Sequence, residues 1–215
     1  LWLEDPQAPQ PSARIPRLRA LSYGSIANGA RGLIYYAFHR MLESDPGGFE
    51  AWWTQFEALG AELNERVPIL IQPLAENQCT TGAADVALRT VSGRLGTWLL
   101  VANGNEQQSR QISINVLPDT TAAVTYDGTA LPLAGGNLQL NLAPYDVYLA
   151  ELKQPKSPDM DSSGRVDFGD LALMALSWET TPSDEDWHTA RDLSDDGSID
   201  AEDLAILAAS WLAEP

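Results

Sequence analysis

The stretch DMDSSGRVDFGDLALMALSW, residues 159–178, decides how the C-terminal part of this chain folds, because it recurs as DLSDDGSIDAEDLAILAASW at residues 192–211. In both copies an acid-rich loop precedes an apolar run that ends in Ser-Trp. Alternate loop positions carry short oxygen side chains, and glycine (Gly164, Gly197) stands at the sixth position. This pattern is typical of a loop whose oxygens converge on one Ca²⁺ ion while the glycine permits a sharp turn.

The spacing predicts two Ca²⁺ sites, one in each loop. We expect ligands from loop positions one, three, five, seven, nine and twelve, with the seventh residue contributing only its backbone carbonyl. The predicted ligands are Asp159, Asp161, Ser163, Arg165, Asp167 and Asp170 in the first loop, and Asp192, Ser194, Asp196, Ser198, Asp200 and Asp203 in the second. The alternative is a calcium-free helical hairpin with solvated acidic loops.

The charge distribution favours bound cations. The chain has a net charge of -17, and residues 154–215 hold 15 acidic residues against 3 Lys or Arg. Such crowding opposes compact folding unless cations neutralise it. The acidic charge also argues against nucleic acid or an anionic membrane surface as a partner, and no apolar run reaches the length of a membrane span.

Hydrophobic periodicity predicts a multidomain chain with three parts. Residues 1–75 are expected to be the C-terminal part of an α/β, TIM-barrel-like domain. A helix over residues 16–28, a buried strand over 32–38 and a Trp-rich helix over 49–67 give the order typical of parallel α/β proteins. Residues 154–215 are expected to form a small all-α calcium-binding domain.

Residues 76–153 are predicted to form an antiparallel β-sandwich, because apolar and polar side chains alternate there. The runs Ile112, Ile114, Val116 and Leu138, Leu140, Leu142 each give one apolar strand face. Asp-Gly at 127–128 and Gly-Gly at 135–136 supply the positive φ that tight hairpins need. Cys79 is the single cysteine, so no intrachain disulfide can form.

The two-loop segment, from about residue 157 to 213, resembles the dockerin family. The resemblance rests on Asp rather than Glu at loop position twelve, on the lack of an entering helix, and on the repeated run LAxxAxSW. It implies a paired calcium-loop module that attaches to a cohesin-like module on a scaffold or cell surface. Loop positions ten and eleven are the implied partner contacts: Phe168, Gly169, Ala201 and Glu202. The stretch ETTPSDEDWHTAR, residues 179–191, makes the connection between the loops long.

Residues 14–38, RIPRLRALSYGSIANGARGLIYYAF, resemble the end of a (β/α)8-barrel glycoside hydrolase, and residues 97–116 are similar to the accessory sandwiches of such enzymes. The resemblance implies the C-terminal piece of a polysaccharide-degrading enzyme. Tyr35, Tyr36 and His39 are then candidates to bind sugar, and Glu4 and Asp5 are candidate catalytic carboxylates. Most of the two-carboxylate machinery of a glycosidase is missing from this stretch, so we expect the fragment alone to be inactive.

Several alternatives remain open. A non-catalytic, calcium-dependent extracellular binding or adhesion protein is the main rival to an enzyme fragment. An intracellular EF-hand sensor is disfavoured by the Asp at position twelve and by the absence of a Met-rich groove. The resemblances imply a secreted protein, extracellular or attached to the cell surface. Trp178 and Trp211 are predicted to fill the core of the calcium module, and the alternative for them is an exposed pair that binds a partner.

Overall fold

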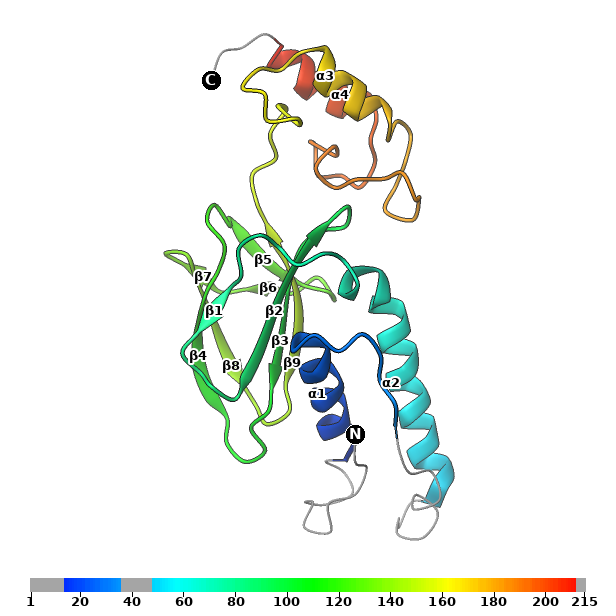
Figure 1. Cartoon of the computed structure of the whole chain (residues 1–215), viewed down its shortest axis with the longest axis vertical. Helices are drawn as coiled ribbons and strands as arrows, with labels where there is room; N and C mark the ends of the chain where they lie inside the picture. The colour runs from blue at the N-terminus through cyan, green and yellow to red at the C-terminus, as the bar shows by residue number, and fades with distance from the viewer. Residues whose placement is uncertain (1–13, 36–47, 212–215) are drawn as a thin grey trace.

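The computed structural model describes residues 14–35 and 48–211. A β-region lies in the middle of the chain, with two helices before it and two short helices after it (Figure 1). The helices are α1 (Arg14–Ala27), α2 (Gly48–Leu70), α3 (Phe168–Ala175) and α4 (Ala201–Ala209). The strands are β1 (Thr80–Thr81), β2 (Val86–Gly93), β3 (Gly96–Asn103), β4 (Arg110–Asn115), β5 (Ala122–Thr125), β6 (Ala130–Leu131), β7 (Leu133–Ala134), β8 (Asn137–Leu142) and β9 (Val147–Lys153).

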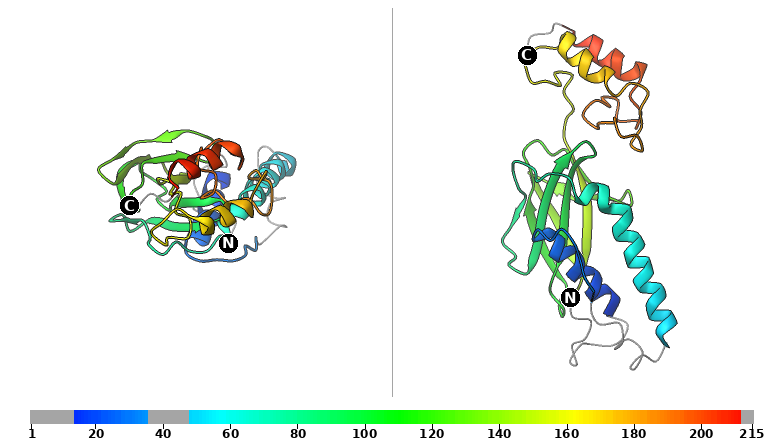
Figure 2. Two further views of the ribbon diagram at one scale, coloured as in Figure 1. Left: turned by 90° about the horizontal axis from the view of Figure 1, so that it is seen from above. Right: turned by 45° about the vertical axis from the view of Figure 1, so that its right-hand side comes forward.

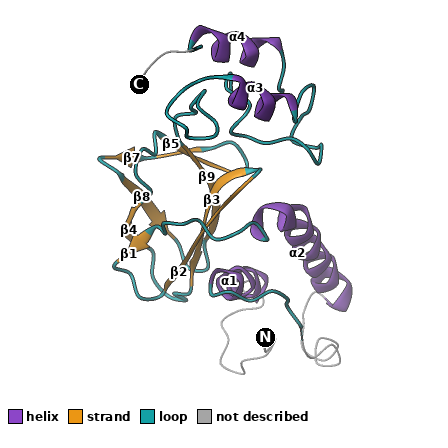
Figure 3. Cartoon of the chain, turned by 45° about the horizontal axis from the view of Figure 1, so that its top comes forward, coloured by secondary structure: helices purple, strands orange, loops and turns teal. Residues whose placement is uncertain are grey.

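The strands form two antiparallel sheets that face each other (Figure 3). One sheet has the order β1-β4-β8-β7 and the other β2-β3-β9-β5-β6. A single buried cluster draws residues from both sheets, among them Leu99 and Val101 of β3, Ile114 of β4 and Leu138 of β8. The predicted antiparallel arrangement of this region is confirmed.

The alternating pattern of β4 and β8 explains how these two strands pair. Ile112 lies opposite Leu140 and Ile114 opposite Leu138, and all four side chains are buried. The intervening polar residues of β4 are exposed. Because side chains alternate between the faces of a strand, a register shift by one residue would expose this apolar face, so burial determines the register.

Helix α1 and the C-terminal end of α2 cover the outer face of the second sheet (Figure 1). Tyr23 of α1 and Leu70 of α2 share a cluster with Val91 of β2 and Leu100 of β3. A further cluster joins the two helices to each other through Leu18, Trp52 and Leu59. The Trp-rich face predicted for residues 49–67 therefore packs against α1.

The predicted end of a TIM barrel is wrong for the described residues, which form antiparallel sheets and no barrel. Residues 32–35 are not in a strand, and Ile34 is 82% exposed; residues 36–38 lie outside the described ranges. A buried parallel strand needs hydrogen-bonding neighbours on its edges. In the described ranges, residues 32–35 belong to neither sheet, so the apolar run there forms no strand. The domain boundaries at 75 and 153 stay predictions.

A partly buried ionic network fixes α1 against α2. Arg19 Nε donates to both oxygens of Glu62, at 2.9 and 3.0 Å, and Arg66 Nη1 lies 2.6 Å from Glu62 Oε1. The hydroxyl of Tyr23, a fully buried residue, donates to the same oxygen at 2.8 Å. Burial by itself raises the pKa of Glu62, but the hydrogen bonds from Arg19 and Tyr23 and the charges of the two arginines outweigh it and lower the pKa.

We expect Glu62→Gln to destabilise the helix–sandwich unit by about 2 kcal/mol at pH 7, because two arginines and a buried hydroxyl lose their charged acceptor. A lowered folded-state pKa stabilises the protein above the unfolded pKa, and this contribution is lost as the pH falls through the folded pKa. The destabilisation should therefore shrink at about pH 3, well below the ordinary Glu pKa of about 4.3. Urea unfolding at both pH values measures it, with the exposed Glu76→Gln as control. An equal effect at both pH values would contradict the assignment.

Candidate metal centre

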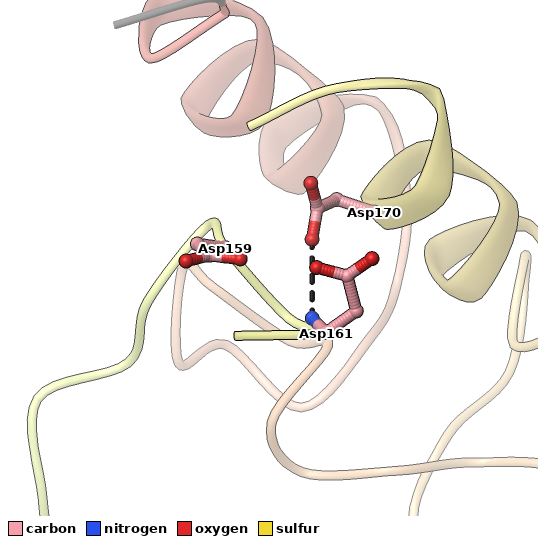
Figure 4. Close-up of side chains that lie close together, drawn as sticks. All are labelled: Asp159, Asp161 and Asp170. Atoms are coloured by element: carbon pink, nitrogen blue, oxygen red, sulfur yellow. Dashed lines mark hydrogen bonds between the residues drawn. The ribbon is translucent and has the colours of Figure 1, made fainter. Parts of the chain in front are cut away.

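Three carboxylates of the first loop converge on one point. Asp159, Asp161 and Asp170 each offer an oxygen, and these oxygens all lie within 4.8 Å of one another (Figure 4). Ca²⁺–oxygen distances of about 2.3–2.6 Å place the ligands of one ion at most about 5 Å apart. The donor set consists only of oxygen, which is the ligand chemistry that calcium prefers. The residues of this loop therefore fit a bound Ca²⁺.

Asp170, at loop position twelve, closes the first loop from inside the protein. Its side chain is fully buried. One carboxylate oxygen accepts from the backbone amides of Met160 at 2.6 Å and Asp161 at 3.2 Å, and the other accepts from Asp167 N at 2.8 Å. These bonds hold the beginning and the end of the loop together without using every lone pair of the carboxylate.

The same loop also starts helix α3. The Asp167 side chain accepts from Gly169 N at 2.8 Å, while Asp170 accepts from Asp167 N, which completes a capping box. Negative charge at a helix N-terminus is favourable because the first amides lack partners and the helix dipole is positive there. The predicted ligands at positions nine and twelve thus also cap the helix.

The first predicted ligand organises the turn of the loop. Asp159 accepts from Ser163 N at 3.0 Å through one oxygen and from Gly164 N at 2.9 Å through the other. Gly164 has φ +86, a conformation that side-chain-bearing residues rarely adopt. The glycine predicted at position six is therefore required by the backbone.

The second loop repeats this hydrogen-bond pattern. Asp203 is fully buried and accepts from Ser194 N and from Asp200 N, both at 2.8 Å. Asp192 accepts from Gly197 N at 3.2 Å, and Gly197 also has φ +86. Asp200 and Asp203 form a capping box at the start of α4. Two segments 33 positions apart thus adopt the same local structure because they carry the same short-range pattern.

The loops differ in their carboxylates. Position three is Asp161 in the first loop and Ser194 in the second. Within residues 14–35 and 48–211, a group of three converging acidic side chains forms in the first loop only. The pKa of Asp161 is lowered by hydrogen bonds from the Ser163 side chain and backbone, and the pKa of Asp196 by the Ser198 amide and hydroxyl. Both groups therefore remain charged at neutral pH, as a cation site requires.

Gly169 has a role in this site that its sequence position did not reveal. A Cβ atom built at Gly169 would lie 2.8 Å from Asp161 Oδ2 and 3.3 Å from Asp167 Oδ1. The equivalent residue of the second loop is Glu202, and that loop has the smaller Ser194 at position three. In the first loop Asp at position three accompanies Gly at position eleven, and in the second loop Ser accompanies Glu. This difference between the copies is the sequence signal that could have identified the role of Gly169.

A small core joins the loops and helices. It contains Val166, Met174, Trp187, Ile199 and Leu207. Val166 and Ile199, at position eight of the two loops, are both buried, and the backbone of Ile199 pairs with Glu179 and Thr180. The prediction that Trp178 fills the core is wrong, since it is 40% exposed and Trp187 takes that place at 6%. Trp211 is half-buried: it packs against the cluster without filling the core as the prediction had it.

Three of the four predicted partner residues are exposed. Phe168 is 75% exposed, and its ring packs edge-on against Trp211 with centroids 5.0 Å apart. Ala201 and Glu202 are exposed, and Gly169 is half-buried. The other exposed large apolar residues of the two helices and their ends are Leu176, Trp178 and Ile206. Apolar exposure of this kind on a small domain is typical of a surface that binds another protein.

Of the predicted sugar and catalytic residues, the structure describes Tyr35. Glu4, Asp5, Tyr36 and His39 lie outside the described residues. Tyr35 is half-buried between α1 and α2: its hydroxyl lies 2.8 Å from Ser22 Oγ, and its ring packs against Phe56. These are packing contacts, and the role of Tyr35 in sugar binding stays a prediction.

Residues 157–210 match the family model of the dockerin type I domain, which confirms the resemblance of this segment. Dockerin domains bind cohesin modules and generally bind calcium, and the proteins that carry them are typically extracellular or attached to the cell surface. No curated protein matches the chain. In the described part of the chain, no helix has the length and apolar character needed to cross a membrane. The glycoside hydrolase resemblance of residues 14–38 receives no support from these findings.

We expect Gly169→Ala to weaken Ca²⁺ binding by the first loop, because the added methyl group displaces the Asp161 carboxylate. Alanine favours helix more than glycine by about 0.5–1 kcal/mol, so α3 itself should not be destabilised. Calorimetric Ca²⁺ titration measures the effect. Glu202→Ala, at the equivalent position of the second loop, is the matched control and should leave the first-loop affinity unchanged. Wild-type affinity in Gly169→Ala would show that Asp161 is not a ligand or that it adjusts freely.

Proposed function

We propose that residues 157–210 bind two Ca²⁺ ions and, in that folded state, attach the chain to a cohesin module of a scaffold or cell surface. The observation that carries this proposal is the pair of buried Asp170 and Asp203 carboxylates, each closing an oxygen-lined loop and capping the helix that follows. The dockerin match of this segment gives the class of partner.

The ions would be held by the twelve predicted residues, six in each loop, with Arg165 and Ser198 contributing backbone carbonyls. Bound Ca²⁺ would neutralise the carboxylates that crowd the loops. The core that carries the two helices is small, and few basic residues accompany the acids of this segment. We therefore expect binding free energy to appear as folding free energy, so that the module is helical with Ca²⁺ and largely unfolded without it.

The partner surface would be the outer side of α3 and α4. It combines the exposed apolar residues Phe168, Leu176 and Ile206 with the ring pair of Phe168 and Trp211. The loop positions ten and eleven differ between the copies, Phe168-Gly169 against Ala201-Glu202. A partner that contacts both helices would therefore meet an apolar side and an acidic side. We propose that binding occurs in one orientation, with the Phe168 side buried.

The remainder of the chain would be the part that the calcium module attaches to the scaffold or cell surface. From the resemblance of residues 14–38 and 97–116, we propose that it belongs to a secreted, polysaccharide-degrading enzyme with its catalytic carboxylates on other segments. The antiparallel sandwich is in keeping with an accessory domain of such an enzyme. Assay of the chain on polysaccharides tests this part separately from the calcium module, and we expect no turnover from these residues alone.

Calcium binding is tested by titrating the chain in a calorimeter and recording circular dichroism in parallel. We expect two ions to bind, with a gain of helix on binding. Asp159→Ala and Asp192→Ala should each reduce the stoichiometry from two to one, because each removes the first ligand of one loop. Asp127→Ala, an exposed acidic residue of the sandwich, is the control. Absence of binding at millimolar Ca²⁺ would refute the proposal.

Partner binding is tested by retention of the chain on immobilised cohesin modules in Ca²⁺ and in EDTA. We expect retention in Ca²⁺ only, and a loss of affinity of about tenfold or more in Phe168→Ala if it is a central contact. Leu74→Ala removes an equally apolar, 58% exposed side chain at the sandwich and should have no effect. Calcium binding without retention on any cohesin would preserve the metal sites and reject this class of partner.

A further inference from the structure

The long connection between the two loops lies on the side of the module that faces the sandwich. In Figures 1 and 2 the helices α3 and α4 stand at the far end of the molecule, and the segment before the second loop descends toward the β-region. The sequence pattern gave this segment, residues 179–191, no function. Its contacts with the β-region are specific enough to assign one.

The turn between β2 and β3 receives the connecting segment. Thr189 N donates to Arg94 O at 2.8 Å, and Arg94 Nη1 donates to Asp184 O at 3.0 Å. The two bonds run in opposite directions between the same two segments and bind backbone groups of the connecting segment at two separate positions. Such a pair determines the orientation of the segment as well as its place.

Leu95 adds an apolar contact at the same turn. Its side chain packs against the cluster that contains Leu100 and Leu149 of the sandwich and also against the module core. The turn is held firmly, because Leu95 N donates to Gln72 Oε1 at 2.9 Å and Trp98 Nε1 donates to Leu95 O at 2.6 Å. One leucine on a rigid turn thus belongs to two hydrophobic cores.

The connecting segment is equally well attached to the module. Trp187 is buried in the module core. Ser177 at the end of α3 donates through its hydroxyl to Asp186 O, and Arg191 Nη1 donates to the same hydroxyl. Residues 184–189 are therefore fixed within the module, so that contacts between these residues and the sandwich hold the module as a whole.

A second attachment lies at the end of β9. Lys153 Nζ is 3.4 Å from Asp195 Oδ1, and Lys156 Nζ is 2.7 Å from the same oxygen and 3.5 Å from Asp192 Oδ2. The hydrogen bond from Lys156 and the charges of both lysines lower the pKa of Asp195. Asp195 is half exposed on its side chain, so this attachment contributes little energy but restricts rotation about the linker.

We propose that residues 184–189 are an intramolecular docking element that binds the β2–β3 turn and makes the sandwich and the calcium module one rigid body. The chain passes between the two only once, through residues 154–158, and a single linker of this kind would by itself permit free reorientation. The contacts at Arg94 and Leu95 lie away from that linker, and Lys153 stands directly before it. They direct the module's connecting segment toward the sandwich and leave α3 and α4 exposed at the far end.

Nitrogen-15 NMR relaxation of the full chain in Ca²⁺ tests this proposal. We expect amides of the sandwich and of residues 157–210 to report one rotational correlation time. In the double variant Arg94→Ala, Leu95→Ala the module should shift to a shorter correlation time than the sandwich. Thr189→Pro, which removes the donor from the module side, should give the same shift and leaves the turn intact. The control is the double variant Leu133→Ala, Arg31→Ala. It changes the same two residue types, a leucine of the β7–β8 hairpin and an exposed arginine, and should keep one correlation time.

Two separate correlation times in the wild type would overturn the proposal, as would a single time in both the double variant and Thr189→Pro. Amide spectra show whether each variant is folded, and the wild-type measurement decides even if a variant is not. The result is independent of partner binding: a rigid chain that ignores cohesin modules would support the docking element and reject the proposed attachment.

Discussion

Two buried carboxylates, Asp170 and Asp203, hold the C-terminal module together. Each accepts backbone amides from the beginning of its own loop and from the residue that caps the following helix. A buried charge is tolerated only when hydrogen bonds or a cation satisfy it. The same carboxylate therefore closes the loop, fixes the start of the helix and lines the proposed cation site, so a change in one of these features affects the other two.

The balance of charge is the reason why we propose that this module depends on a bound cation. Residues 154–215 concentrate acidic groups around a core of few apolar side chains. Lys153 and Lys156 offset part of this charge at the second loop, where Asp195 and Asp192 accept their ammonium groups. The first loop has three converging aspartates, and the lysines do not reach it in these contacts. The two loops are thus alike in backbone structure and different in electrostatics.

The sandwich gives this module a fixed base. Its two sheets are held by a core of alternating apolar residues, and α1 and α2 stiffen one outer face through the Glu62 network. Gln72, just after α2, accepts from the β2–β3 turn that contacts the connecting segment. A continuous set of contacts therefore runs from the helix pair through the β2–β3 turn to the module core.

The sequence by itself determined the features that depend on neighbouring residues. The two loops, their glycines at positive φ, the starts of α3 and α4 and the faces of β4 and β8 all follow from short-range patterns. Tertiary structure alone decided which tryptophan is buried, why Gly169 must be small, where residues 179–191 lie and that residues 32–35 form no strand. Each of these depends on groups far apart in the chain: Trp187 fills a space bounded by both helices, and a strand forms only where a neighbour supplies its hydrogen bonds. Local sequence patterns limit the secondary structure that each segment can adopt. Contacts between segments far apart in the chain decide which of these structures forms and which side chains are buried.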